Sequence, residues 1–89
     1  MSYILIRHKV ADFSIWKKVY DAHLPLRQRA GLKENQLFRG ANGSNEVVIL
    51  FSTDNLERAK EFAASEELRL TMQKAGVIGR PEVSFLEDA

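Results

Sequence analysis

The chain contains no cysteine, and this absence excludes several kinds of protein. Without cysteine there is no disulfide framework, no thiolate nucleophile and no thiolate metal ligand. Apolar runs are short as well, and none approaches the ~20 residues that span a membrane. Glycine and proline are few, at five and two of 89 residues, and there is no low-complexity segment. Disordered and fibrous chains have other compositions.

Neither sign of charge dominates. Thirteen basic residues against twelve acidic ones leave a formal net charge of +1, and the two signs are interleaved along the sequence. Binding to nucleic acid or to an anionic membrane needs clustered Lys and Arg, so we expect neither partner. The first residues enter a strand pattern without a signal-peptide layout, which predicts a cytoplasmic location. The composition, 45% hydrophobic and 28% charged, is typical of one globular domain, here residues 1–89.

The most apolar stretch is Val47–Phe51, which follows the turn-rich segment 40–45. A run this short and this apolar predicts a strand that is buried on both faces. Alternate side chains of a strand point to opposite faces, so two layers are needed to cover it. The chain has helices for only one layer. We therefore expect a second copy of the chain to supply the other.

Periodicity and turn signals predict the order β-α-β-β-α-β. Strands are expected over 3–9, 34–39, 47–51 and 81–86, helices over 13–30 and, in two pieces, 56–75, and a loop over 77–80. Asp12, Asp54 and Ser65 are the expected helix caps. Pro25 falls inside the first helix and should break it near His23.

This order defines a ferredoxin-like α+β fold, a four-stranded antiparallel sheet with its helices on one face. The first and third strands lie in the middle of such a sheet, and here they are the two most apolar strands. The other face would be bare in a single subunit. Two sheets packed face to face around a two-fold axis would bury it, which predicts a homodimer through the helix-free face.

Four segments carry a family pattern: Asp12-Phe13-x-x-Trp16-Lys17, 45–50, Leu56-x-x-Ala59-x-x-Phe62, and 75–77 leading to 81–86. Together they resemble the dimeric α/β-barrel superfamily, and within it the small proteins related to antibiotic biosynthesis monooxygenases and cyclases. The resemblance implies a homodimer with a pocket between sheet and helices in each subunit. The superfamily also includes lactone isomerases, haem-degrading enzymes and stress proteins. Haem-degrading members carry a tryptophan and a histidine in the second half of the chain, and this sequence has neither there.

Several polar side chains fall at the centre of the apolar stripe of the first helix. At 100° per residue, Trp16, Tyr20, His23 and Arg27 lie within about 60° of one another. His8 shares the apolar face of the first strand. If that face looks toward the helices, His8, Tyr20 and His23 converge on one cavity, and we expect them to be the catalytic residues.

Each residue type suits one chemical role. Histidine can take a proton from a phenol or an enol, a phenol hydroxyl can orient an oxygen, and a guanidinium can stabilise an oxyanion or bind a carboxylate. The expected substrate-binding residues are Trp16, Arg27, Phe38 and Phe51, which are aromatic walls and one cation. The set favours cofactor-independent oxygenation, cyclisation or isomerisation of a small aromatic or polyketide-like compound. We expect no metal, although two histidines with a carboxylate could still form a metal site.

A second interpretation stays open, namely a non-catalytic ligand-binding or stress-response barrel whose polar residues are structural. The two histidines would then be satisfied core residues, Trp16 would pack, and Arg27 would reach the helix end or pair with a glutamate. A cavity of roughly 300 Å³ or more that His8 or His23 faces would favour the enzyme. A filled core at that place would favour the second interpretation.

Overall fold

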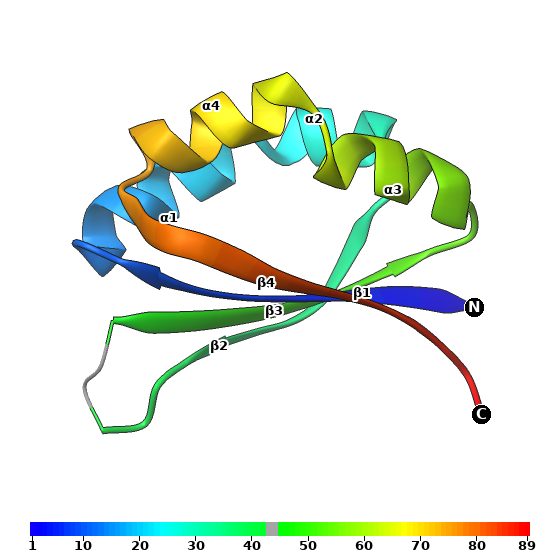
Figure 1. Cartoon of the computed structure of the whole chain (residues 1–89), viewed down its shortest axis with the longest axis horizontal. Coiled ribbons are helices and arrows are strands. Elements are labelled where there is room, and N and C mark those ends of the chain that lie inside the picture. Colours follow the sequence, from blue (N-terminus) through cyan, green and yellow to red (C-terminus); the bar gives the residue numbers. More distant parts are fainter. Residues whose placement is uncertain (43–44) are drawn as a thin grey trace.

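The structure is a computed structural model and describes residues 1–42 and 45–89, so part of the segment expected as a turn lies outside the described residues (Figure 1). The strands are β1 (Ser2–Val10), β2 (Lys33–Arg39), β3 (Glu46–Thr53) and β4 (Val77–Glu87), and the helices are α1 (Phe13–Ala22), α2 (Leu24–Arg29), α3 (Leu56–Ala63) and α4 (Glu66–Lys74). The strands form one antiparallel sheet in the order β2-β3-β1-β4. All of the helices cover the same face of it (Figure 1). The predicted ferredoxin-like α+β fold is confirmed.

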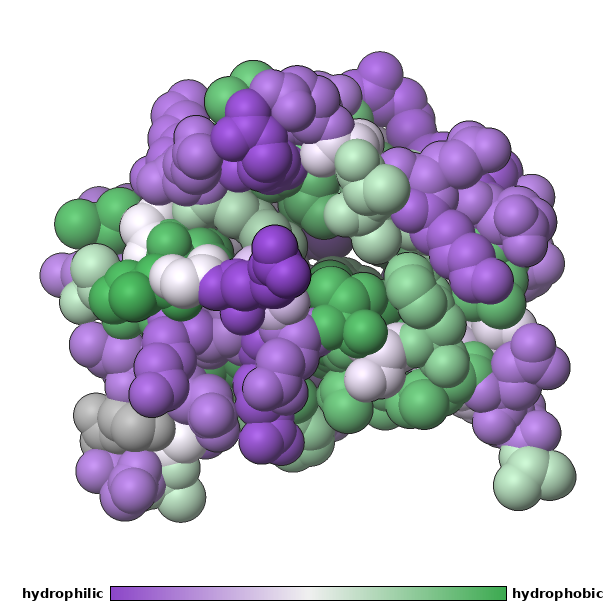
Figure 2. Space-filling view, viewed as in Figure 1, coloured by the Kyte–Doolittle hydropathy of each residue, from purple (hydrophilic) through white to green (hydrophobic). Residues whose placement is uncertain are grey.

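The two central strands supply most of the core. Their register pairs Ile4 with Phe51, Ile6 with Ile49 and His8 with Val47. Residues directly opposite each other share a face of the sheet, and all of these side chains are buried beneath the helices. Figure 2 shows apolar side chains gathered in the hollow between the sheet and a mostly hydrophilic helix layer. The core therefore lies on the helix-covered face.

The helix expected over 13–30 is broken where Pro25 predicts. α1 ends at Ala22, α2 begins at Leu24, and His23 lies between them with a backbone N–H that reaches the carbonyls of Val19 and Tyr20. A proline cannot donate the hydrogen bond that would continue α1, but it is tolerated in the first turn of a new helix. The break makes room for the side chain of His23 to leave the helix axis toward α4.

Two local predictions are wrong. The cap of α3 is Asn55, whose side chain accepts from the Arg58 N–H at 3.1 Å, and not Asp54. The Thr53 hydroxyl accepts the Asn55 N–H at 3.1 Å. This bond holds Asn55 in the cap position, so the helix begins one residue later than predicted. The Asp12 and Ser65 caps are confirmed.

The second wrong prediction is the loop over 77–80, because β4 already begins there. The pairing of β4 with β1 shifts register between Arg7 and Lys9, and the extra residues include Gly79 at a φ of 72°. Pro81 follows at once. β4 lies at the edge of the sheet, so no further strand pairs with its outer side. The N–H that Pro81 lacks is therefore not needed there for a hydrogen bond between strands. An irregular edge strand thus accommodates both the glycine and the proline.

The helix-free face of the sheet carries apolar side chains of its own. Leu5, Val48 and Leu50 are half-buried there, while Phe38 and Leu86 are 50% and 42% exposed. The register pairs Phe38 with Val48 on this face.

No helix of the described residues is long and apolar enough to cross a membrane.

Candidate functional site

A cavity lies between the helices and the buried face of the central strands. Its volume is about 60 Å³. Six of the seven expected site residues line it: His8, Trp16, Tyr20, His23, Arg27 and Phe51. No carboxylate is among its described lining residues. The room is smaller than the roughly 300 Å³ expected of an enzyme pocket, yet the core at this place is not filled.

His8 presents two unpaired ring nitrogens to this region. The residue is 5% exposed, and neither Nδ1 nor Nε2 has a hydrogen-bond partner among the described residues. Burial lowers the pKa of His8 to about 4 from 6.5, so the imidazole is neutral near pH 7. A neutral imidazole offers one N–H donor and one lone pair. His8 can therefore accept a proton or donate a hydrogen bond without first breaking an existing contact.

An aromatic row leads away from His8 along α1. The ring of Trp16 lies 5.6 Å from that of His8, and the ring of Tyr20 stacks on Trp16 at 4.8 Å with an interplanar angle of 16°. The helix makes this possible because residues four positions apart share one face. Trp16 is 3% exposed and belongs to the core, and its indole also lines the cavity.

The Tyr20 hydroxyl is engaged outside this row. It donates to Oε1 of Glu34 at 2.5 Å, and burial together with this bond raises the pKa of Tyr20 above its usual value. Sequence reasoning missed Glu34, because strict alternation along β2 places it on the face of Phe38. A bulge shifts the register between Glu34 and Gln36 and turns Glu34 toward the helices. Tyr20 thus stays protonated and contributes its ring to the cavity.

Arg27 closes the far end of the row. Its Cζ lies 3.7 Å from the centroid of the Tyr20 ring, and its Nη1 donates to the Tyr20 carbonyl at 2.6 Å. The side chain is 7% exposed, and burial lowers its pKa, although an arginine remains charged in proteins. No carboxylate forms an ion pair with Arg27 among the described residues. Its charge is held by an aromatic face and one carbonyl.

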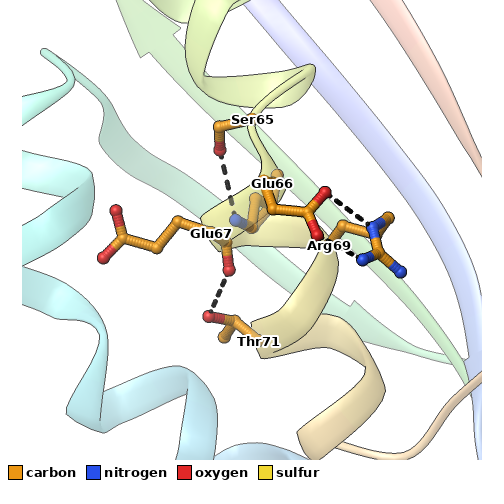
Figure 3. A network of polar contacts seen from close by, with 6 residues as sticks. Ser65, Glu66, Glu67, Arg69 and Thr71 are labelled. Carbon is orange, nitrogen blue, oxygen red and sulfur yellow. Dashed lines mark hydrogen bonds and ion pairs between the residues drawn. The ribbon is translucent and has the colours of Figure 1, made fainter.

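His23 is tied to α4 through Thr71, a residue that sequence reasoning also missed. The His23 Nε2 lies 3.3 Å from Thr71 Oγ1. The Thr71 hydroxyl donates to the Glu67 carbonyl at 2.8 Å (Figure 3). Since a hydroxyl has one hydrogen, the Nε2 of His23 must be the donor in the first contact. Only the Nδ1 of a neutral His23 is then left to accept a proton.

The first turn of α4, which precedes Thr71, is held by contacts of its own. Ser65 caps the helix by accepting the Leu68 N–H at 3.1 Å, and Glu66 pairs with Arg69 on the exposed side (Figure 3). Thr71 follows this first turn, and its hydroxyl is held by the Glu67 carbonyl. The sequence signal for its contact with His23 is weak: Thr71 lies on the apolar face of the helix expected over 56–75.

Phe38 is the one expected site residue that the structure places elsewhere. It lies on the helix-free face of the sheet at 50% exposure, so it is not a wall of this cavity. Aromatic and aliphatic side chains of α3 and α4, Phe62, Leu68 and Met72, line the cavity in its place. No group of three or more His, Asp or Glu side chains able to hold a metal occurs in the described part of the chain.

Comparisons with known proteins concern the fold. No family model and no curated protein sequence matches the chain. A structure from Bordetella bronchiseptica, provisionally described as an antibiotic biosynthesis monooxygenase, matches 99% of this chain and 96% of its own with a TM-score of 0.80 and 13% identity. A similarly described structure from Caulobacter crescentus CB15 matches 99% and 89%, with a TM-score of 0.71 and 17% identity.

A third structure extends the comparison beyond that group. An uncharacterised NIPSNAP domain protein from Burkholderia xenovorans covers 100% of this chain and 95% of its own, with a TM-score of 0.66 and 14% identity. At such identities the likeness establishes the fold alone. The chain has the ferredoxin-like fold that antibiotic biosynthesis monooxygenase and NIPSNAP structures share over its whole length, and the resemblance drawn from the sequence is confirmed at that level.

Proposed function

We propose that the protein is a cofactor-independent enzyme of the monooxygenase or cyclase type that acts on a small aromatic or polyketide-like compound. The observation that carries the proposal is His8, a buried neutral imidazole beside an apolar cavity, with neither ring nitrogen paired to any described residue. An unpaired buried polar group costs folding free energy, so a use in binding or proton transfer is the simplest reason for it. The fold, shared with proteins described as monooxygenases, supports the same class.

The proposed chemistry begins with proton transfer to His8. The lone pair of the imidazole takes the proton of a phenol, an enol or an activated methylene group, and the substrate is left as the conjugate anion. Burial alone lowers the pKa of His8, and the negative charge of the substrate anion raises it again because that charge stabilises the imidazolium. The electron pair of that anion can attack a carbonyl carbon and close a ring. Alternatively, the anion reacts with dioxygen: a methylene group becomes a carbonyl, one oxygen atom enters the product and the other leaves as water. The electrons come from the substrate in either case.

We further propose that the active form is a cytoplasmic homodimer. Half-buried Val48 and Leu50 and exposed Phe38 form an apolar patch on the helix-free face, which a second copy would cover. Two sheets that pack this way leave each cavity beneath its own helices, on the side away from the interface.

The alternative is a non-catalytic ligand-binding protein, and two observations favour it. Tyr20 and His23 both have intramolecular hydrogen-bond partners, as structural residues do. The room inside the cavity is also small. In this alternative His8 would orient a ligand without accepting its proton.

Turnover separates the two functions. The protein would be incubated with small phenols, hydroxyquinones and anthrones while oxygen consumption and product mass are recorded. We expect one of these compounds to be converted, and His8→Leu to lower kcat by at least a hundredfold, as the loss of a general base does. Conversion that survives His8→Leu would contradict the site assignment. Binding without conversion would favour the alternative.

A further inference from the structure

We infer that the ligand of the cavity is a small hydroxylated aromatic acid, whose carboxylate is bound by Arg27 and whose hydroxyl reaches His8. The inference rests on the proposed function, since it names the substrate class for the same cavity. It depends on the two polar ends of the cavity and on what lies between them.

The first end is a buried cation that forms no ion pair with the described residues. Arg27 is 7% exposed, the one hydrogen bond of its side chain within the described residues goes to the Tyr20 carbonyl, and the Tyr20 ring covers one face of the guanidinium. The described walls of the cavity include no carboxylate that could balance this charge. A ligand carboxylate would supply the missing charge and accept from the remaining N–H groups, which have the planar geometry that carboxylates match.

Glu34 does not fill this role. Its Oε1 accepts from the Tyr20 hydroxyl, and it acts on the pKa of Arg27 only from a distance, as Asp21 does. No ion pair joins the Arg27 guanidinium to the Glu34 carboxylate among the described residues. The positive charge of Arg27 is therefore still available to a ligand.

The second end is neutral. The ring nitrogens of His8 have no hydrogen-bond partner among the described residues and the residue is 5% exposed, so a ligand group beside the ring must supply either a donor or an acceptor. A hydroxyl is the smallest group that supplies both, and it fits either tautomer of the imidazole. A second carboxylate at this end would have no cation to pair with. The chemistry at His8 thus favours a neutral hydroxyl.

Two aromatic rings, Trp16 and Tyr20, separate the two polar ends, which favours one flat ligand with a polar group at each end. His8, Trp16, Tyr20 and Arg27 follow one another in a row, with the two central rings stacked at 4.8 Å. A single functional group cannot touch both His8 and Arg27 across these rings. An aromatic ring with a polar group at each end would lie along the row, with Phe51 and Phe62 as further walls.

The test measures binding of four probes by calorimetry: 4-hydroxybenzoate, its methyl ester, benzoate and phenol. We expect 4-hydroxybenzoate to bind at least tenfold more tightly than each of the others, because each lacks one of the two polar contacts. Arg27→Met should abolish the preference for the acid over its ester and leave phenol binding unchanged. His8→Leu should abolish the preference for 4-hydroxybenzoate over benzoate.

Two further variants keep the test decisive. Arg27→Lys retains the charge and should retain a preference for the acid, even where Arg27→Met folds poorly. Arg69→Met removes an exposed arginine outside the cavity and should change no preference. The inference is overturned if the acid binds no better than its ester, if none of the probes binds, or if Arg69→Met has the effect expected of Arg27→Met.

The inference and the proposed function fail in different ways. Selective binding of 4-hydroxybenzoate without conversion would leave the inference standing and overturn the catalytic proposal. Conversion of neutral phenols without any preference for a carboxylate would leave the catalytic proposal standing and overturn the inference.

Discussion

The Tyr20 hydroxyl donates a 2.5 Å hydrogen bond to Glu34 Oε1 and so joins α1 to β2. The same tyrosine holds Arg27 in two ways, through its ring face and through its carbonyl. One carboxylate on an edge strand therefore positions, through Tyr20, the cation at the end of the cavity. Glu34 acts on the site without lining it.

This relationship can be measured with a double-mutant cycle. Tyr20→Phe and Glu34→Ala should each lower the free energy of unfolding by about 1 kcal/mol, because each removes a hydrogen bond to a charged acceptor that is partly open to solvent. The double variant should lose little more than either single variant, since both remove the same bond. Urea denaturation of the four proteins gives the comparison. Additive losses would mean that the two side chains do not interact in solution.

The buried neutral state of His8 should appear in the acid dependence of stability. The pKa of His8 is about 4 in the folded chain and 6.5 when exposed, so between these values the unfolded chain binds more protons. The free energy of unfolding should therefore fall as the pH falls from 6.5 to 4, by at most about 3 kcal/mol from this residue. His8→Leu should remove that part of the slope. Equal slopes in the two proteins would show that His8 is solvated in the native state.

Trp16 provides an optical signal for the cavity, since it is the one tryptophan of the chain. It contacts both His8 and Tyr20, so a ligand that enters the cavity should change its emission in parallel with calorimetric binding. Trp16→Ala should lower the free energy of unfolding by about 3 kcal/mol or more, because it empties a buried site, and Trp16→Phe should cost less. Binding that leaves the Trp16 emission unchanged would place the ligand elsewhere.

The proposed homodimer can be tested with two single substitutions, one that places a charge on the helix-free face of the sheet and one that places a charge on the helix side. Leu50→Asp places a carboxylate in the helix-free face and should convert a dimer into a less stable monomer in sedimentation experiments. Ile15→Asp is the matched control, because Ile15 is 54% exposed on α1, and it should leave the mass unchanged. A wild-type chain that sediments as a folded monomer at micromolar concentration would refute the dimer.

The fold could be predicted because its signals are local and strong. The apolar run Val47–Phe51 marks a central strand, and Pro25 breaks the first helix where predicted. Gly31 and Gly76 follow helical segments at φ of 79° and 80°, a left-handed conformation that glycine adopts readily and that commonly ends a helix. Each of these features depends on a few neighbouring residues, and no tertiary contact overrides it.

The site was harder to predict because its details depend on register and on contacts between distant elements. One bulge in β2 turns Glu34 toward the helices, and Asn35 beside it accepts a 2.8 Å hydrogen bond from Ser52. Thr71 meets His23 across 48 positions of sequence. Alternation placed Phe38 on one face of β2 without saying which face looks toward the helices. The spacing of residues along the sequence does not predict strand register or contacts between distant elements.

The most direct test of the account is the nitrogen NMR spectrum of the His8 ring in the free and ligand-bound protein. We predict a neutral imidazole from pH 8 down to about pH 5, as a pKa of about 4 requires, and a change in its ring-nitrogen shifts when an aromatic ligand binds. Titration near pH 6.5 with no response to any bound ligand would contradict the claim that His8 is the buried polar group around which the cavity works.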